Sequence, residues 1–163
     1  MAKEFELTDD MRAQIGRQSP PFTMEVTTTS VRAFARGVGY TDPVYFDRAA
    51  AQRAGYRDLP APPTYLGTPV FIPGESDNTF SAPRAARVGI THGLKGLLDG
   101  GTETEYFDVI CAGDTLTVVS RIAALDVRTS PSLGKMLLMT TESTYTNQHG
   151  TKVAGQRGQA IFY

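Results

Sequence analysis

The order of hydrophobic and polar residues divides the chain into a helical first part and a strand-rich second part. In the second part, stretches rich in Val, Ile, Leu and Thr are separated by short polar turns. Such stretches are typical of antiparallel strands joined as a meander. The pattern predicts strands at residues 102–107, 115–128, 135–147 and 152–163.

The first part carries the signals that begin and end short helices. Thr8, Thr27 and Asp47 each precede a run with helical spacing, and each can cap the first turn of its helix. Glycines at positions 16, 39 and 55 follow these runs and are expected to end them. A short strand is expected at residues 22–26, between the first and second helices.

A further helix is expected to begin near Pro63, because the first turn of a helix tolerates proline. It would run over residues 64–71, with Pro69 ending or kinking it. Residues 72–89 are rich in Gly, Pro, Ser and Asp, and we expect them to form a long loop. A long antiparallel sheet buries one face, which a helix must cover. The expected fold class is α+β, with a curved antiparallel sheet around one central helix.

Composition and charge narrow the function classes. A chain of 163 residues with 40% hydrophobic content fits a single domain, taken here as residues 1–163. The net charge of −1 and the lack of a basic stripe argue against a nucleic-acid partner. No apolar run approaches the roughly 20 residues of a membrane span, and no signal peptide is recognisable at the N-terminus. With Cys111 as the single cysteine, we expect a cytoplasmic protein without an internal disulfide.

Five short motifs, in the same order as in a known family, carry a resemblance. Residues 34–47 read FARGVGYTDPVYFD, and residues 61–66 read APPTYL. The other three are GGTETEYF at 100–107, GDTL at 113–116, and TYTNQHG with a following Gln-Arg in 144–157. Together they resemble the MaoC-like (R)-specific enoyl-thioester hydratases and dehydratases, and within them the FAS1-like, N-terminal type of dehydratase domain. The resemblance implies a hotdog fold.

The resemblance also implies where the chemistry should lie. Active members carry an Asp and a His five residues apart, in a DxNPxH segment, for acid/base work. They also use a backbone N–H at the start of the central helix to stabilise the enolate oxygen. These three positions fall on Tyr40, Tyr45 and Pro63 in this chain, and proline has no N–H. A tyrosine with its ordinary pKa of about 10 is a poor base at neutral pH.

The joint loss of these elements favours a subunit that does not perform the chemistry. In the family, domains without the Asp/His pair join a catalytic hotdog domain and shape its acyl-binding tunnel. The resemblance therefore implies a heteromer that acts on an acyl-CoA or acyl-carrier-protein thioester. The sequence shows no metal-ligand spacing and no nucleotide-binding loop, so we expect no cofactor and no metal. Loop 72–89 would cover the tunnel mouth or contact the partner. The residues expected to face the substrate are Tyr40, Asp42, Tyr45, Pro63, Thr64 and Tyr65.

Several alternatives stay open. Four tyrosines fit core positions with a polar tip as well as they fit a tunnel lining, namely Tyr40, Tyr45, Tyr56 and Tyr65. The chain could be a homodimeric hydratase or dehydratase that uses Asp42 or His92 as its catalytic residue. Against this, Asp42 before Pro43 is also a turn initiator, and His92 also fits a solvated loop. Asp99 stands where the family has a His, and we expect it to accept backbone hydrogen bonds. A third possibility is a non-enzymatic protein that binds acyl thioesters.

Overall fold

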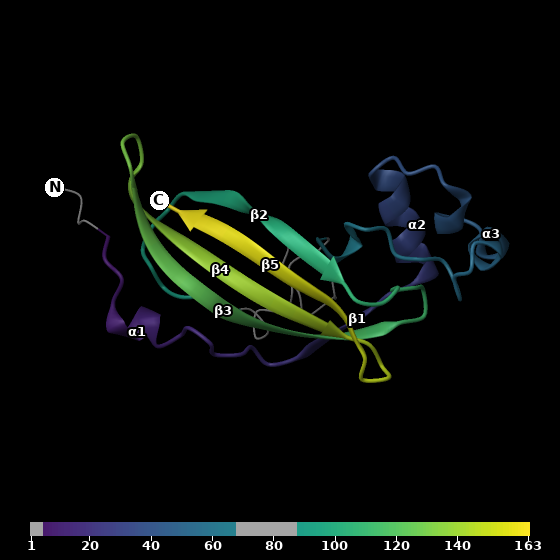
Figure 1. Ribbon diagram of the computed structural model, residues 1–163. Coiled ribbons are helices and arrows are strands. Elements are labelled where there is room, and N and C mark those ends of the chain that lie inside the picture. The colour runs from purple at the N-terminus through teal and green to yellow at the C-terminus, as the bar shows by residue number, and fades with distance from the viewer. Residues whose placement is uncertain (1–4, 68–87) are drawn as a thin grey trace.

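The computed structural model describes residues 5–67 and 88–163. Its main feature is a five-stranded antiparallel sheet with strand order β1-β3-β4-β5-β2. The strands are β1 (Phe22–Glu25), β2 (Leu97–Tyr106), β3 (Thr115–Ser130), β4 (Gly134–Thr146) and β5 (Lys152–Phe162). Figure 1 shows the long strands curving together. The predicted antiparallel meander is therefore confirmed, with β3, β4 and β5 as neighbours.

Alternation along these strands explains which face of the sheet is buried. Val118, Tyr145 and Ala154 lie side by side on β3, β4 and β5, and all three are buried. Successive side chains of a strand point to opposite faces. The neighbours Thr144 and Gly155 therefore belong to the other face, which carries most of the charged residues of these strands.

The prediction for β2 was wrong at its start, which lies at Leu97 rather than Thr102. The pairing with β5 shifts register between Asp99 and Thr102, so the strand contains a bulge there. The Asp99 carboxylate accepts a hydrogen bond of 2.8 Å from the backbone N–H of Gly101, whose φ is +105°. This is the backbone bond expected of Asp99. In the sequence the two glycines resemble a turn, whereas the structure uses them to bend a continuous edge strand.

Three short helices follow the predicted caps. They are α1 (Asp9–Arg12), α2 (Thr28–Gly37) and α3 (Arg48–Arg53). The backbone N–H groups of Met11, Ser30 and Ala50 donate to Thr8, Thr27 and Asp47 at 3.3, 3.0 and 2.6 Å. A 3-10 turn, η1 (Pro43–Tyr45), was not predicted. Figure 1 shows α2 and α3 together beyond one end of the sheet, opposite the β3–β4 turn.

Only the first residues of the segment expected to form the central helix are described. They form a single 3-10 turn, η2 (Tyr65–Gly67), after a turn at Pro63 and Thr64. Residues 68–71, and the expected loop 72–89 apart from its last two residues, lie outside the described part of the chain. Among the described helices, none combines the length and the apolar character needed to cross a membrane.

The hydrophobic core attaches residues 27–58, which we call the overhang, to one end of the sheet. Val31 of α2 and Leu59 are fully buried and pack with Leu116 and Val153 of the sheet. A second cluster, around Ile122, Leu125 and Leu137, fills the other end of the sheet. Because the overhang is anchored by α2 and Leu59, the segment between them is held over the end of β2.

Candidate functional site

The candidate site is a pocket of about 450 Å³ between the overhang and the end of β2. We call it the tyrosine pocket. Its lining residues are Tyr45, Tyr56, Pro60, Ala61, Pro63, Tyr106, Phe107, Asp108 and Val109. The structure thus brings together two of the positions expected at the site, Tyr45 and Pro63. Aromatic rings, prolines and aliphatic groups form most of the lining, beside the Asp108 carboxylate, so the pocket offers both apolar and polar contacts to a ligand.

Asp42 shapes the segment that holds Tyr45. Its carboxylate accepts a hydrogen bond of 3.0 Å from the backbone N–H of Val44 and caps η1. This 3-10 turn brings Tyr45 beside Tyr40, with ring centroids 5.3 Å apart. The turn-initiator interpretation of Asp42 is therefore supported by the geometry. Asp42 and Tyr40 are exposed and are outside the lining of the tyrosine pocket.

The electrostatics of Tyr45 do not favour base catalysis. Burial raises the pKa of its phenol above the ordinary value, and nearby Tyr40, Asp42 and Tyr56 raise it further. Tyr106, on the opposite wall, also has a pKa raised by burial. Both side chains are consequently neutral at pH 7. Among the described residues that line the pocket, Asp108 is the one carboxylate, and it accepts from the Val109 N–H at 2.7 Å.

Pro63 sits at the beginning of η2, where the resemblance places an N–H donor. Its carbonyl oxygen accepts a hydrogen bond from the Tyr106 hydroxyl, so this point of the chain is tied to the end of β2. The neighbouring Thr64 is exposed and does not line the pocket. With no N–H at Pro63, the position can shape the pocket but cannot stabilise an oxyanion through its own amide.

Tyr65 is buried in the core and does not line the tyrosine pocket. It is 3% exposed, and its hydroxyl is 2.7 Å from the hydroxyl oxygen of Ser30 on α2. Its ring meets Phe34 edge to face, with centroids 5.7 Å apart. Burial raises the pKa of Tyr65, against a smaller lowering effect of the Ser30 hydrogen bond. These contacts place Tyr65 in the core, which is one of the two environments that the sequence allowed for the tyrosines.

His92 lies far from the tyrosine pocket. Its ring packs on Phe162 at 4.1 Å between centroids, and its Nδ1 accepts from the Leu94 N–H. Burial lowers the pKa of His92, so the neutral form is favoured. Tyr106 of the pocket pairs with Ala154, at the other end of β5 from Phe162. At a strand rise of about 3.3 Å per residue, the separation along β5 is roughly 25 Å.

Six lining residues were not among those expected at the site, namely Pro60, Ala61 and residues 106–109. Tyr106 to Val109 form the end of β2 and the segment after it. The signal available was the Tyr-Phe pair in the GGTETEYF motif, two aromatic residues at the end of a strand. Phe107 also lies under a cation, with Lys152 Nζ 4.4 Å from its ring centroid.

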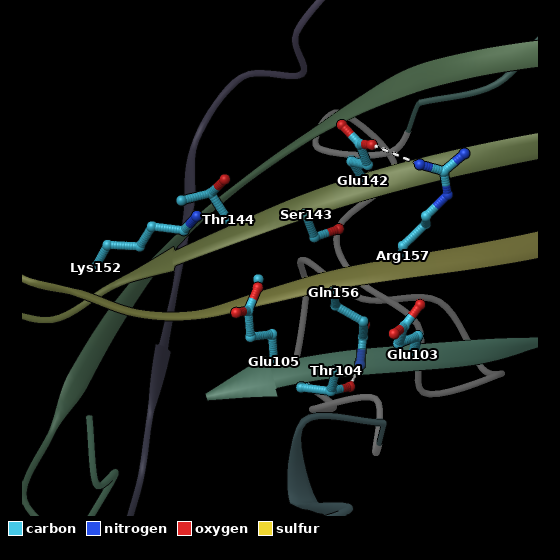
Figure 2. Close-up of a pocket in the computed structure, with 10 residues that line it drawn as sticks. Glu103, Thr104, Glu105, Glu142, Ser143, Thr144, Lys152, Gln156 and Arg157 are labelled. Atoms are coloured by element: carbon cyan, nitrogen blue, oxygen red, sulfur yellow. Dashed lines mark hydrogen bonds and ion pairs between the residues drawn. The ribbon is translucent and has the colours of Figure 1, made fainter. Parts of the chain in front are cut away.

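A second groove, of about 620 Å³, lies on the face of the sheet away from the core. Figure 2 shows Glu103 and Glu105 of β2 facing it, with Glu142 of β4 and Lys152 and Arg157 of β5. Glu142 forms ion pairs with Arg157 at 3.3 Å and with Arg121 at 2.7 Å. The groove is polar, and Glu142 and Arg157 are the lining residues whose charges are paired across the strands among the described residues.

The chain is similar to proteins of one family over most of its length. Residues 13–156 match the family model described as FAS1-like, dehydratase domain region. A UPF0336 protein of Parafrankia is 31% identical over 147 residues, which are 90% of this chain and 82% of that protein. A probable enoyl-CoA hydratase alpha subunit of Thermomonospora curvata is 26% identical over 144 residues, 83% of this chain and 44% of that protein.

A solved structure of a dehydratase is similar to this chain in fold. The C-terminally truncated HadBC (3R-hydroxyacyl-ACP dehydratase) complex of Mycobacterium tuberculosis contains a chain with a TM-score of 0.66 and 22% identity. The match covers 91% of this chain and 96% of that one. At this identity the likeness concerns the fold, and it confirms the expected hotdog arrangement.

Proposed function

The chain belongs to the family of the FAS1-like dehydratase domain region, and from this we propose that it is the substrate-binding, non-catalytic half of an enoyl-thioester hydratase or 3-hydroxyacyl-thioester dehydratase. Its catalytic partner would be a second hotdog chain that carries the Asp/His pair. The substrate would be an acyl-CoA or acyl-carrier-protein thioester whose apolar chain enters the tyrosine pocket.

One observation carries the proposal. Tyr45 and Pro63, which replace the catalytic His and the N–H donor of active relatives, line one and the same pocket. At the positions that the resemblance assigns to these groups, the pocket therefore carries a phenol and a proline. Hydration of an enoyl thioester needs a group that moves protons near neutral pH and donors aimed at the thioester oxygen. A neutral phenol and a proline provide neither.

The free edge of β2 is a second argument for a partner chain. Within the described residues, β2 pairs with β5 alone, so the backbone groups of its other edge lack a strand partner. Leu97 and Leu98 on this strand are 62% and 45% exposed. An exposed strand edge with backbone groups that lack a strand partner is a site at which a second strand can add, and Leu97 and Leu98 make the first part of this edge apolar. A hotdog chain added there would place its own side chains next to Tyr106 and the tyrosine pocket.

Hydration assays test the proposal. Crotonyl-CoA and trans-2-dodecenoyl-CoA are offered to the purified chain, with and without a co-expressed hotdog chain that retains an intact DxNPxH segment. We expect no turnover by the chain alone, and turnover of the longer substrate by the pair that exceeds that of the partner by itself. Turnover by the chain alone at an ordinary enzymatic rate, about 1–1000 per second, would refute the proposal.

The assay also separates the two alternatives. If the chain alone is active and Asp42→Ala or His92→Ala abolishes this activity, it is an enzyme in its own right. If it binds thioesters but no catalytic hotdog chain gains activity from it, it is a binding protein. The cap formed by Asp42 and the distance of His92 from the pocket argue against the first of these outcomes.

A further inference from the structure

Asp114 is a buried carboxylate on which three parts of the chain converge. Asp114 is 3% exposed and lies in the turn before β3. The Cys111 N–H donates to Oδ2 at 2.9 Å, and the Arg57 guanidinium forms an ion pair with the same oxygen. The Gln148 side-chain amide donates to Oδ1 at 3.3 Å. The carboxylate therefore joins the overhang, its own turn and the β4–β5 turn.

Arg57 makes a second contact, and that contact reaches the tyrosine pocket. Its Nη1 donates to the carbonyl oxygen of Val109 at 3.2 Å, while Nη2 binds Asp114. Val109 lines one wall of the pocket, and Tyr56, the residue before Arg57, lines the opposite wall. The guanidinium holds two acceptors at once because its N–H groups have a fixed, planar arrangement. Arg57 thus bridges the two walls without lining the pocket.

Backbone hydrogen bonds nearby keep the two segments together without Arg57. The Ala61 N–H donates to the Ile110 carbonyl at 2.8 Å, and the Ala112 N–H donates to the Leu59 carbonyl at 2.9 Å. Arg57 lies beyond the end of this short ladder. Its contacts hold the ends of the two segments, at Tyr56 and Val109, which line the pocket. Its loss should therefore loosen the pocket rather than unfold the chain.

We infer that Arg57 is a positioning residue of the tyrosine pocket: anchored on Asp114, it fixes the spacing of the Tyr56 and Val109 walls and thereby sets the affinity for the acyl thioester. The inference rests on the proposed function for the identity of the ligand. The positioning of the pocket wall is a property of the chain itself, and hydrogen exchange tests it without a ligand.

The test compares Arg57→Gln and Arg57→Lys with Arg48→Gln as a matched control. Arg48 forms an ion pair of 2.8 Å with Asp58 on the same overhang and does not line the pocket. Three quantities are measured for each full-length variant. They are the melting temperature, the affinity for dodecanoyl-CoA by calorimetry, and hydrogen exchange at residues 107–110 in the ligand-free chain. Dodecanoyl-CoA is saturated, so it binds without reacting.

We expect Arg57→Gln to weaken dodecanoyl-CoA binding about tenfold, since a charge-assisted hydrogen bond and the pocket spacing are lost together. Exchange at residues 107–110 should become faster. Arg48→Gln should leave both quantities unchanged within about twofold. A lysine at position 57 can pair with Asp114, but its single ammonium lacks the fork that also reaches Val109. Arg57→Lys should therefore restore the melting temperature but not the affinity.

Two results would overturn the inference. In the first, Arg57→Gln binds dodecanoyl-CoA and exchanges as the wild type does. In the second, Arg57→Lys restores affinity together with melting temperature, which would indicate a purely stabilising ion pair. If the wild type itself does not bind dodecanoyl-CoA, the proposed ligand is wrong. The exchange rates then decide: faster exchange in Arg57→Gln but not in Arg48→Gln supports the positioning role, and unchanged exchange in Arg57→Gln rejects it.

Discussion

The Tyr106 hydroxyl donates a hydrogen bond to the carbonyl oxygen of Pro63, and this contact joins the end of the edge strand β2 to the turn that precedes η2. Both residues line the tyrosine pocket. The bond therefore connects the proposed partner-binding edge with the position where active relatives place an N–H donor. A substitution of either residue should therefore change the shape of the pocket.

Tyr106→Phe removes this hydrogen bond and keeps the aromatic ring. We expect the free energy of unfolding to fall by about 1 kcal/mol, the usual net value of one such bond, in urea denaturation. Tyr40→Phe is the matched control, because the Tyr40 hydroxyl makes no hydrogen bond within the described residues and its ring is likewise partly exposed. Equal stability of the two variants would contradict the bond.

Val109→Trp tests the pocket as the acyl-binding site. Val109 is 45% exposed, so a larger side chain there should cost little stability, while an indole would fill much of the pocket. We expect partner-dependent hydration of dodecenoyl-CoA to fall more than tenfold, with a smaller effect on crotonyl-CoA. Val38→Trp, at an exposed valine outside the pocket, is the control. If the two variants hydrate dodecenoyl-CoA equally well, the acyl chain binds elsewhere.

The helix caps and the long strands were predictable because their signals are local. Thr27 and Ser30 form the capping box by themselves, and the runs of Val, Ile, Leu and Thr mark the long strands. The start of β2 was missed for the opposite reason. Gly100 and Gly101 have the composition of a turn, and only pairing with β5 makes them a bulge.

The site was predictable only in part, because a pocket depends on contacts between distant segments. Tyr45 and Pro63 could be identified by resemblance to active relatives, and both line the pocket. Tyr65 fitted a tunnel and a core equally well, and the partners that bury it and bind its hydroxyl, Ser30 among them, lie on distant segments. Val109 carries no chemical signal in the sequence, and its role follows from the fold alone.

Leu98→Lys tests the edge of β2 as the partner-binding surface. A lysine on an edge strand opposes strand addition, because its charge must stay hydrated. We expect association, measured by light scattering with and without the catalytic hotdog chain, to weaken at least about tenfold, or 1.4 kcal/mol. The control is Leu133→Lys, since Leu133 is also exposed but lies in the β3–β4 turn. Unchanged association of Leu98→Lys would place the interface on another surface.

Tyr145 should make the stability of the fold depend on alkaline pH. Burial raises the pKa of its phenol to about 12, with a smaller contribution from Tyr106, whereas the unfolded chain has a tyrosine pKa of about 10. A group with a raised pKa in the folded state stabilises the fold fully below the unfolded pKa. This stability is lost as the pH rises from about 10 towards 12, because the unfolded state then releases the proton first.

The expected loss is about 2 kcal/mol between pH 9 and pH 11.5 in urea denaturation. Lysines and the other tyrosines also titrate in this range, so the comparison with Tyr145→Phe isolates the contribution of this residue. That variant loses the hydrogen bond from Tyr145 to Gln156, of 3.1 Å, which lowers stability at neutral pH. Its stability should then fall less steeply above pH 10 than that of the wild type. Parallel curves would mean that Tyr145 ionises in the folded protein as easily as in the unfolded chain, and that its burial beside Val118 and Ala154 does not hold in solution.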